Sequence, residues 1–363
     1  MTSAMEQLAA QGQSVWLDYI RRDMLENGDM AAMVADGLRG MTSNPSIFEK
    51  AIAGSNQYDD DIERFVADNP SATPIEIFEH LAIEDIQAAA DILAPVYERT
   101  DGADGFVSLE VSPTLANDTA GTIAEARRLW AAVGRPNLMI KVPATEAGIP
   151  AIETLIGENI NVNVTLMFSM DHYEAVSHAY LRGIEKAADP SRVASVASFF
   201  VSRVDTAVDN QLAELGAAGA PLLGKVAIAN AKVTYQRYLE LFGDDFEAEW
   251  GKGAFPQRLL WASTGTKNPA YSDIMYVEGL IGHNTVNTLP PATLDAFADH
   301  GSADVAALVE DVDDAYAVLE QLEAVGVDLD AITDQLQTDG VQAFIDAFDG
   351  LLGAIKEKRS ALV

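Results

Sequence analysis

One lysine lies inside an apolar segment of the chain. Lys141 belongs to the run 137–142, which is bounded by Pro136 and Pro143, and a short run of this kind predicts a buried strand. Burial disfavours the charged form of an amine, and a neutral amine is a nucleophile that condenses with a carbonyl to form a Schiff base. The structural alternative is a lysine that reaches the surface or pairs with a carboxylate.

Polar residues of other kinds interrupt or follow similar apolar runs. Asp18 and Glu110 each stand among apolar neighbours, where a carboxylate is unfavourable unless it has a partner or a purpose. Asn163 and Thr165 alternate with valines, so they share one face of a strand. The remaining candidates are Thr42, Asn44, Asn161, Ser198, Arg203, Ser263 and Lys267. Carboxylates, amides, hydroxyls and cations around one lysine suit carbonyl chemistry on a polyhydroxylated, anionic substrate.

Simpler explanations stay open for some of these residues. Asn163 and Thr165 can serve only to satisfy hydrogen bonds within the fold. Asn44 is followed by a proline, a pattern that is also typical of a helix N-cap.

The sequence predicts neither a metal nor a cofactor. The chain has no cysteine, and its five histidines show no ligand spacing. The glycines that follow Lys141, Gly148 and Gly157, are too sparse for a nucleotide-binding loop.

Eight short apolar segments must position these side chains. They alternate with helical patterns, which predicts an α/β fold, a (β/α)8 TIM barrel. Such a barrel carries its chemistry at the carboxyl-terminal ends of the strands, where most of the candidates fall. The predicted strands span residues 14–19, 38–42, 105–111, 137–142, 160–165, 193–198, 258–263 and 284–288.

The chain is longer than the roughly 250 residues typical of this fold. The excess falls in 50–103, 207–257 and 301–363. No repeat or linker divides the chain, so we expect a single domain over residues 1–363.

The last segment predicts additional helices near the rim of the site. Ser302 is a plausible N-cap for a helix with a periodic apolar face formed by Val305, Leu308, Val312 and Tyr316. A second apolar face consists of Val341, Phe344, Ile345 and Phe348. Three cations complement the dipole at the end of that helix: Lys356, Lys358 and Arg359.

The composition limits the partners of the protein. Apolar residues make up 48% of the chain, enough for a large core, and the net charge is 23 − 56 = −33. Such a charge argues against nucleic acid and anionic membranes. No apolar stretch approaches a membrane span and no signal peptide is visible, so we expect a cytoplasmic protein.

Two motifs resemble a known family. The run 40–48, GMTSNPSIF, is similar to the N-terminal signature of transaldolases, and the run 137–145, NLMIKVPAT, with 160–166 resembles their Schiff-base lysine region. The later runs 261–269 and 284–290 resemble the longer bacterial and plant-type branch of that family.

The resemblance implies a transaldolase of the pentose phosphate pathway. Such an enzyme moves a dihydroxyacetone unit from sedoheptulose 7-phosphate or fructose 6-phosphate to glyceraldehyde 3-phosphate or erythrose 4-phosphate, with no metal or cofactor. By this resemblance Lys141 forms the Schiff base and Asp18 acts on the C4 hydroxyl. Glu110 moves protons through a water that Thr165 also holds.

The resemblance also implies the substrate contacts. By this resemblance the hydroxyls of the dihydroxyacetone unit are bound by Thr42, Asn44, Asn163 and Ser198. Ser263 lies on the same rim. Arg203 matches a phosphate-binding arginine. Many relatives carry a second arginine where this chain has Gly265, so Lys267 is the nearest substitute. We expect a monomer or homodimer.

Three other functions remain possible from the residues alone. A simple class I aldolase shares the imine chemistry and releases dihydroxyacetone without an acceptor. A glycosidase would use Asp18 and Glu110 as its carboxylate pair and leave Lys141 unexplained. A sensor of sugar phosphates would need no acid, base and nucleophile together.

Overall fold

A closed barrel of eight parallel strands forms the centre of the molecule. The computed structural model describes residues 3–243, 246 and 253–362. Parts of the predicted ranges 207–257 and 1–363, namely 1–2, 244–245, 247–252 and 363, lie outside the described residues. The strands follow one another around the barrel in chain order, and β1 pairs with β8 to close it. The predicted fold class is confirmed.

All eight predicted strands are present, and their ends differ from the prediction by at most two residues. The strands are β1 Gln13–Asp18, β2 Gly40–Thr42, β3 Phe106–Glu110, β4 Leu138–Pro143, β5 Val162–Met167, β6 Ser195–Phe200, β7 Arg258–Ala262 and β8 Thr285–Leu289. Every residue of β3, β4, β5, β6 and β8 is buried. Strands covered on both sides read as continuous apolar runs, which is why the sequence located them well.

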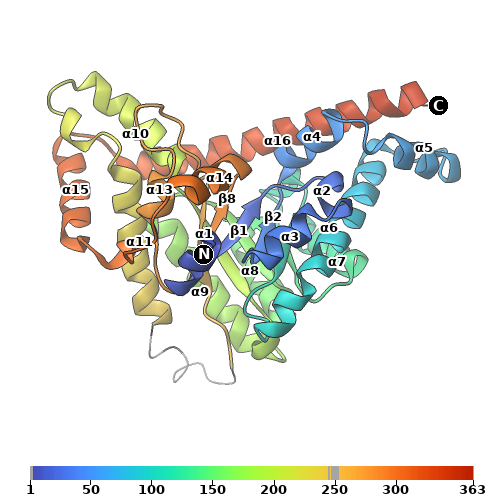
Figure 1. Cartoon of the computed structure of the whole chain (residues 1–363), viewed down its shortest axis with the longest axis horizontal. Coiled ribbons are helices and arrows are strands. Elements are labelled where there is room, and N and C mark those ends of the chain that lie inside the picture. Colours follow the sequence, from blue (N-terminus) through green and yellow to red (C-terminus); the bar gives the residue numbers. More distant parts are fainter. Residues whose placement is uncertain (1–2, 244–245, 247–252, 363) are drawn as a thin grey trace.

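Helices surround the barrel (Figure 1). Those before and between the first strands are α1 Ala4–Ala10, α2 Arg22–Glu26, α3 Asp29–Ala35, α4 Pro45–Ala53, α5 Asp59–Asp68, α6 Pro74–Arg99 and α7 Thr119–Val133. The later helices are α8 Gly148–Gly157, α9 Met170–Lys186, α10 Ser202–Glu214, α11 Val226–Phe242, α13 Met275–Glu278, α14 Pro291–His300, α15 Val312–Ala324 and α16 Leu329–Leu362. Short 3-10 turns occur at Pro113–Leu115, Pro190–Arg192, Ala220–Leu222 and Ala307–Val309.

The predicted helix after Ser302 is wrong. The Ser302 hydroxyl bonds to Asp304 instead of capping a helix, and the chain reaches α15 only at Val312. Val305 is 53% exposed, whereas Leu308 is fully buried and its N–H donates to the carbonyl of Ile281. One buried leucine anchors an irregular segment to the barrel, so the apolar spacing did not mark a buried helix face.

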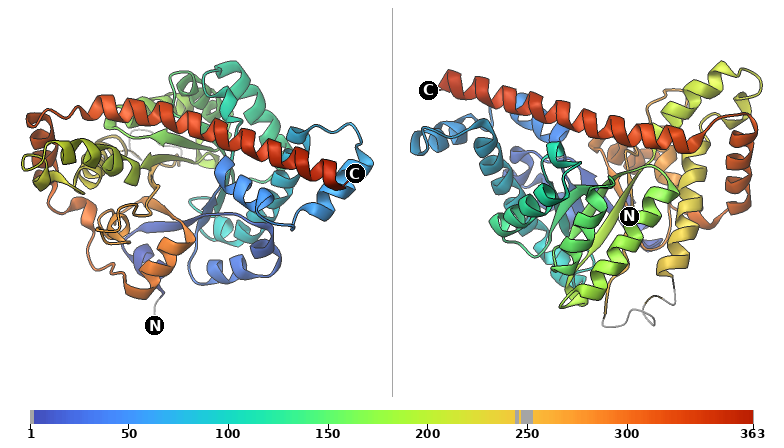
Figure 2. Two further views of the ribbon diagram at one scale, coloured as in Figure 1. Left: turned by 90° about the horizontal axis from the view of Figure 1, so that it is seen from above. Right: turned by 180° about the vertical axis from the view of Figure 1, so that it is seen from behind.

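The second predicted face belongs to α16, which lies across the molecule (Figure 2). Val341, Phe344 and Phe348 are buried as predicted. The cations at the end of the helix also bind neighbouring segments of the chain. Lys358 donates to the carbonyl of Ser55 and pairs with Asp59.

Arg359 donates to the carbonyls of Ala72 and Pro70 at 2.5 and 2.7 Å. These bonds and those of Lys358 fasten the C-terminal helix to the segment between α4 and α6. Among residues 3–243 and 253–362, no helix combines the length and apolarity needed to cross a membrane.

Candidate active site

The carboxyl-terminal ends of the strands meet around a cavity of about 400 Å³. The predicted residues in its wall are Asp18, Thr42, Asn44, Lys141, Ser198, Arg203, Ser263 and Lys267. These side chains come from five separate segments of the chain, around residues 18, 42–44, 141, 198–203 and 263–267, so only closure of the barrel brings them together. Glu110, Asn163 and Thr165 are buried among the strands next to this wall.

Lys141 lies near the end of β4, between Glu110 of β3 and Asn163 of β5 in the strand register. Its side chain is 5% exposed, and its Nζ donates to the carbonyl of Ser43 at 3.1 Å. The same nitrogen lies 3.6 Å from Glu110 Oε2 and 5.9 Å from the centre of the Phe344 ring. The lysine is buried and paired with a carboxylate, yet its tip reaches the cavity.

Glu110 is a carboxyl group held almost out of contact with solvent, with a side chain 3% exposed. Burial raises the pKa of Glu110 to about 7, although nearby Lys141 opposes this shift. Within the described part of the chain, neither carboxyl oxygen makes a hydrogen bond, and neither does the buried hydroxyl of Thr165. Buried polar atoms without partners are rare in native proteins, so these atoms are available to a ligand or a water.

Asp18 ends β1 and reaches the cavity. It accepts a hydrogen bond from the Thr42 hydroxyl at 2.7 Å, and Thr42 in turn lies 2.7 Å from the hydroxyl of Thr288. Burial raises the pKa of Asp18, opposed by Lys141, the Thr42 hydrogen bond, Lys267 and Arg203. A second carboxyl with a raised pKa therefore faces the same amine.

A chain of hydrogen bonds crosses the barrel below the cavity. Ser198 donates to Asn163 Oδ1 at 2.7 Å, and Asn163 Nδ2 donates to Ser108 at 2.9 Å. Asn163 is fully buried and both ends of its amide bond to protein. Asn163 thus makes the internal hydrogen bonds that the structural alternative expected, and Ser198, to which it bonds, also lines the cavity.

Asn44 fits both of the interpretations that the sequence allowed. Its Oδ1 accepts a hydrogen bond from the N–H of Ile47 at 3.0 Å and caps α4. The same side chain lines the cavity. The helix cap therefore fixes an amide at the rim.

Asn161 was predicted at the site and lies elsewhere. Its amide donates to the carbonyls of Pro136 and Leu138, and it accepts from the N–H of Ala194. It precedes β5 and joins neighbouring strands at the amino-terminal end of the barrel. Strand polarity explains the error, because only the carboxyl-terminal end of a strand reaches the cavity.

Cations gather at the outer part of the cavity. Arg203, Lys267 and Lys50 line it, and none of them forms a salt bridge with a carboxylate in the part of the chain that the structure describes. The Arg203 guanidinium lies 5.2 Å from the centre of the Phe200 ring, and burial lowers its pKa, opposed by Asp18. Unpaired cations in a chain of charge −33 are suited to an anionic group.

The segment after β7 carries Lys267 and is tied to α10. Ser263 adopts a left-handed conformation, φ 55°, and its hydroxyl lies 3.0 Å from that of Ser202 at the start of α10. Tyr271 donates to Asp209 of α10 at 2.6 Å. One helix therefore supports both Arg203 and the segment that bears Lys267.

Sequence reasoning missed Lys50 and Thr288. Lys50 lies four residues after Ser46 on α4, and both line the cavity, so the helical period offered a signal. Thr288 is the last residue of the predicted strand 284–288, and the same strand-end rule that selected the others points to it.

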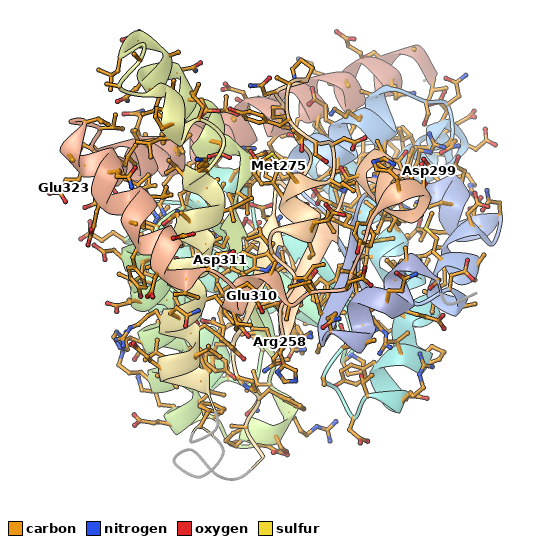
Figure 3. The ribbon with its side chains drawn as sticks, turned by 60° about the vertical axis from the view of Figure 1, so that its left-hand side comes forward. Arg258, Met275, Asp299, Glu310, Asp311 and Glu323 are labelled. Atoms are coloured by element: carbon orange, nitrogen blue, oxygen red, sulfur yellow. The ribbon has the colours of Figure 1, made fainter. Side chains whose placement is uncertain are left out.

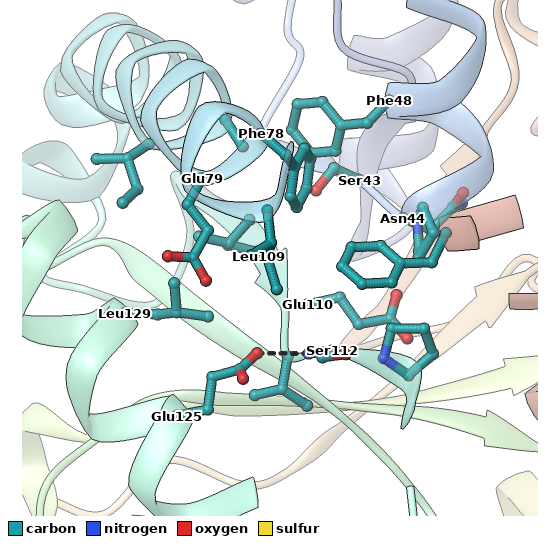
Figure 4. A pocket seen from close by; sticks show the side chains of 17 residues that line it. Ser43, Asn44, Phe48, Phe78, Glu79, Leu109, Glu110, Ser112, Glu125 and Leu129 are labelled. Atoms are coloured by element: carbon teal, nitrogen blue, oxygen red, sulfur yellow. Dashed lines mark hydrogen bonds between the residues drawn. The ribbon is translucent and has the colours of Figure 1, made fainter. Parts of the chain in front are cut away.

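A second, smaller cavity has Glu110 in its wall (Figure 4). It offers about 20 Å³, room for about one water. Phe48, Phe78 and Leu109 form much of its wall, and Glu125 nearby accepts a hydrogen bond from the N–H of Ser112 at 2.6 Å. A sugar does not fit there, so the larger cavity is the candidate substrate site.

Comparison with known proteins identifies the family. The transaldolase/fructose-6-phosphate aldolase family matches residues 15–355. A transaldolase of Thiobacillus denitrificans is 51% identical over 95% of this chain and 97% of its own length. One from Trichodesmium erythraeum is 47% identical, covering 99% and 98%, and transaldolase 2 of Nostoc punctiforme is 46% identical, covering 99% of each. With a lysine, two carboxyls and unpaired cations at the strand ends of one barrel, the chain belongs to the transaldolase/fructose-6-phosphate aldolase family, as its motifs predicted.

Proposed function

We propose that this protein is a transaldolase of the pentose phosphate pathway. It transfers a dihydroxyacetone unit from sedoheptulose 7-phosphate or fructose 6-phosphate to glyceraldehyde 3-phosphate or erythrose 4-phosphate. Relatives named transaldolase at 47–51% identity over nearly the whole chain support this function. The observation that carries the mechanism is the buried Lys141 amine, 3.6 Å from Glu110 in a wall that also holds Asp18.

In the proposed first step, the neutral Lys141 amine attacks the carbonyl of the ketose. Loss of water then gives an imine, and Glu110 supplies and removes the protons through a water that Thr165 helps to hold. A carboxyl group whose pKa is raised to about 7 is suited to exchange protons in both directions near neutral pH.

The protonated imine next draws electrons from the C3–C4 bond. Asp18 takes the proton of the C4 hydroxyl as this bond breaks, the aldose phosphate leaves, and the enamine remains on Lys141. An incoming aldose phosphate reacts with the enamine, Asp18 returns a proton to the new hydroxyl, and hydrolysis of the imine frees the product.

The remaining wall residues bind the substrate in this proposal. Thr42, Asn44 and Ser198 hold hydroxyls, Asn163 orients Ser198 from below, and Ser263 supports the rim. Arg203 and Lys267 hold the phosphate, and Lys50 adds a third cation near them. The cytoplasmic location and the monomer or homodimer expected from the sequence stay part of the proposal.

Borohydride reduction in the presence of fructose 6-phosphate tests the mechanism. We expect a three-carbon adduct on Lys141 and on no other lysine, located by peptide mass mapping. Lys141→Arg removes the adduct and the activity, whereas Lys186→Arg, an exposed lysine on α9, serves as the matched control. Labelling of another lysine, or a fully active Lys141→Arg variant, contradicts the mechanism.

The same incubation separates a transferase from an aldolase. Without an aldose acceptor, a transaldolase holds the three-carbon unit on Lys141 and releases little dihydroxyacetone. Release in proportion to the fructose 6-phosphate supplied would identify a simple aldolase instead.

A further inference from the structure

Strand β5 is irregular where it meets the active site. The register between β5 and β6 shifts between Val164 and Met167, so Thr165 and Leu166 both lie opposite Ser198. Leu166 has a φ of 61°, a left-handed conformation that non-glycine residues seldom adopt. A bulge of this kind redirects a side chain next to an active site and needs support from its surroundings.

That support comes from a helix far away in the sequence. The side-chain amide of Gln337 on α16 donates to the carbonyl of Ala144 and to that of Leu166, both at 3.0 Å. The N–H of Ala144 donates to the carbonyl of Thr165 at 2.7 Å. One amide nitrogen thus joins the end of β5 to the residue that follows β4, three positions after Lys141.

Gly340 lies almost one turn further along α16. Because it has no side chain, the helix can approach Leu166 closely. A Cβ added there would lie 2.9 Å from Leu166 Cδ2 and 3.6 Å from Arg203 Nη1. The contact is tight enough that a side chain at position 340 would press on the bulge. Gln337 thus bonds to the Leu166 backbone, and Gly340 on the same helix leaves room for the Leu166 side chain.

We propose that Gln337 is a positioning residue for the reaction. Its amide keeps the β5 bulge closed and thereby holds the Thr165 hydroxyl at the place where protons move beside Lys141. Thr165 is fully buried, and its hydroxyl has no hydrogen-bond partner in the described part of the chain, so its position depends on the local backbone and on packing rather than on a hydrogen bond. This inference rests on the proposed function, because it assigns Thr165 a part in proton transfer.

Gln337→Met tests the proposal, since methionine keeps the length of the side chain and removes the donor. We expect kcat to fall about tenfold, while KM for fructose 6-phosphate stays within about twofold. The variant loses the hydrogen bond to Leu166 in the bulge and the one to Ala144 after β4, and the phosphate site is untouched. Gln337→Glu should lose as much, because a carboxylate cannot donate to a carbonyl. The control is Gln335→Met on the same helix, whose amide reaches only Asp339.

A double-mutant cycle distinguishes positioning from general support of the fold. In a Thr165→Val background, Gln337→Met should reduce kcat little further, because the hydroxyl that it positions is already absent. Additive losses, or a Gln337→Met enzyme with the turnover of the parent, would overturn the proposal. If Gln337→Met folds poorly, Gln337→Glu replaces it in the same cycle, because it also removes the amide donor.

Borohydride trapping of the parent enzyme separates this inference from the proposed function. If the parent forms no adduct on Lys141, the proposed function fails. If it forms the adduct and Gln337→Met turns over normally, only the role of Gln337 fails.

Discussion

Two carboxyl groups with raised pKa values face one buried amine at the end of the barrel. Burial opposes the ionisation of both Asp18 and Glu110. The nearby Lys141 amine partly offsets this effect at Glu110, because a cation favours an ionised carboxylate. Glu110, whose pKa is raised to about 7, can exchange protons near neutral pH. At the residue scale, these groups are suited to the proton transfers of the proposed mechanism.

The stability of the protein should depend on Glu110 as the pH changes. The unfolded chain releases this proton near 4.5 and the folded chain near 7. Because the folded state holds the proton more tightly, ionisation destabilises the fold progressively from about pH 4.5 to 7 and by a constant amount above. Glu110→Gln removes this effect, so its Tm should exceed that of the parent by a few degrees at about pH 8.

The difference in Tm between Glu110→Gln and the parent should shrink toward about pH 5, where Glu110 is protonated in the folded parent as well. Thermal unfolding followed by circular dichroism across this range measures it. Glu357→Gln, an exposed carboxyl on α16, is the control. A gain in Tm that is the same at every pH would contradict the expected titration of Glu110.

Arg203 and Lys267, the proposed phosphate ligands, should contribute unequally to the binding of the substrate phosphate. Arg203 is partly buried and can grip a phosphate with two N–H groups, whereas Lys267 is exposed and offers a point charge. Arg203→Ala should raise KM for fructose 6-phosphate about ten- to a hundredfold and leave the turnover of unphosphorylated fructose nearly unchanged. Lys267→Ala should act in the same direction and more weakly.

Steady-state kinetics with both sugars measures these effects, with Lys186→Ala as a control for the loss of one surface charge. An Arg203→Ala enzyme that prefers the phosphorylated sugar as strongly as the parent would remove Arg203 from the phosphate site.

At the scale of elements, α16 covers the site and stabilises it. The helix packs on α4, α6, α10 and β5, and its far end is held by Lys358 and Arg359. Phe344 places an aromatic ring over Lys141. A transferase must keep water away from the covalent intermediate, and this ring lines the cavity beside the lysine.

Phe344→Leu should therefore loosen the cover without emptying the core. We expect several times more dihydroxyacetone to be released from fructose 6-phosphate in the absence of an acceptor, with only a modest fall in Tm. An enzymatic assay for dihydroxyacetone measures the release, and Phe65→Leu on α5 is a control away from the cavity. Unchanged release would show that Phe344 does not exclude water.

At the scale of the whole molecule, the acidic surface contrasts with the cationic cavity. Acidic side chains such as Asp299, Glu310, Asp311 and Glu323 are exposed on the outer elements (Figure 3). A net charge of −33 favours solubility, but the acidic side chains also repel one another in the folded state. The local cations of the cavity must attract an anionic substrate against this field.

Salt should stabilise the fold without abolishing the preference for phosphate. The Debye length falls from about 30 Å at 0.01 M to about 3 Å at 1 M, so KCl screens the surface repulsion. We expect Tm to rise over this range, while KM for fructose 6-phosphate stays below that for fructose, because contacts at hydrogen-bond distance are screened less. A Tm that does not change with KCl would show that surface repulsion is minor.

The sequence by itself determined the strands and the central lysine. Each strand is a local apolar run, and burial of β4 follows from residues that are neighbours in the chain. Lys141 was found for the same reason, because a lysine inside an apolar run can be recognised from its sequence neighbours alone. The motifs then indicated the family, which the comparisons confirmed.

Only the tertiary structure decided which polar residues meet. Asn161 and Asn163 are two residues apart, yet one joins strands at the amino-terminal end and the other lies below the cavity. Gln337 of α16 bonds to Leu166 of β5, 171 residues away in the sequence, and Leu308 holds an irregular segment that its spacing predicted as a helix. Contacts of this kind join residues that are distant in sequence, and no local pattern encodes them, because their energy arises only when the closed barrel brings the elements together.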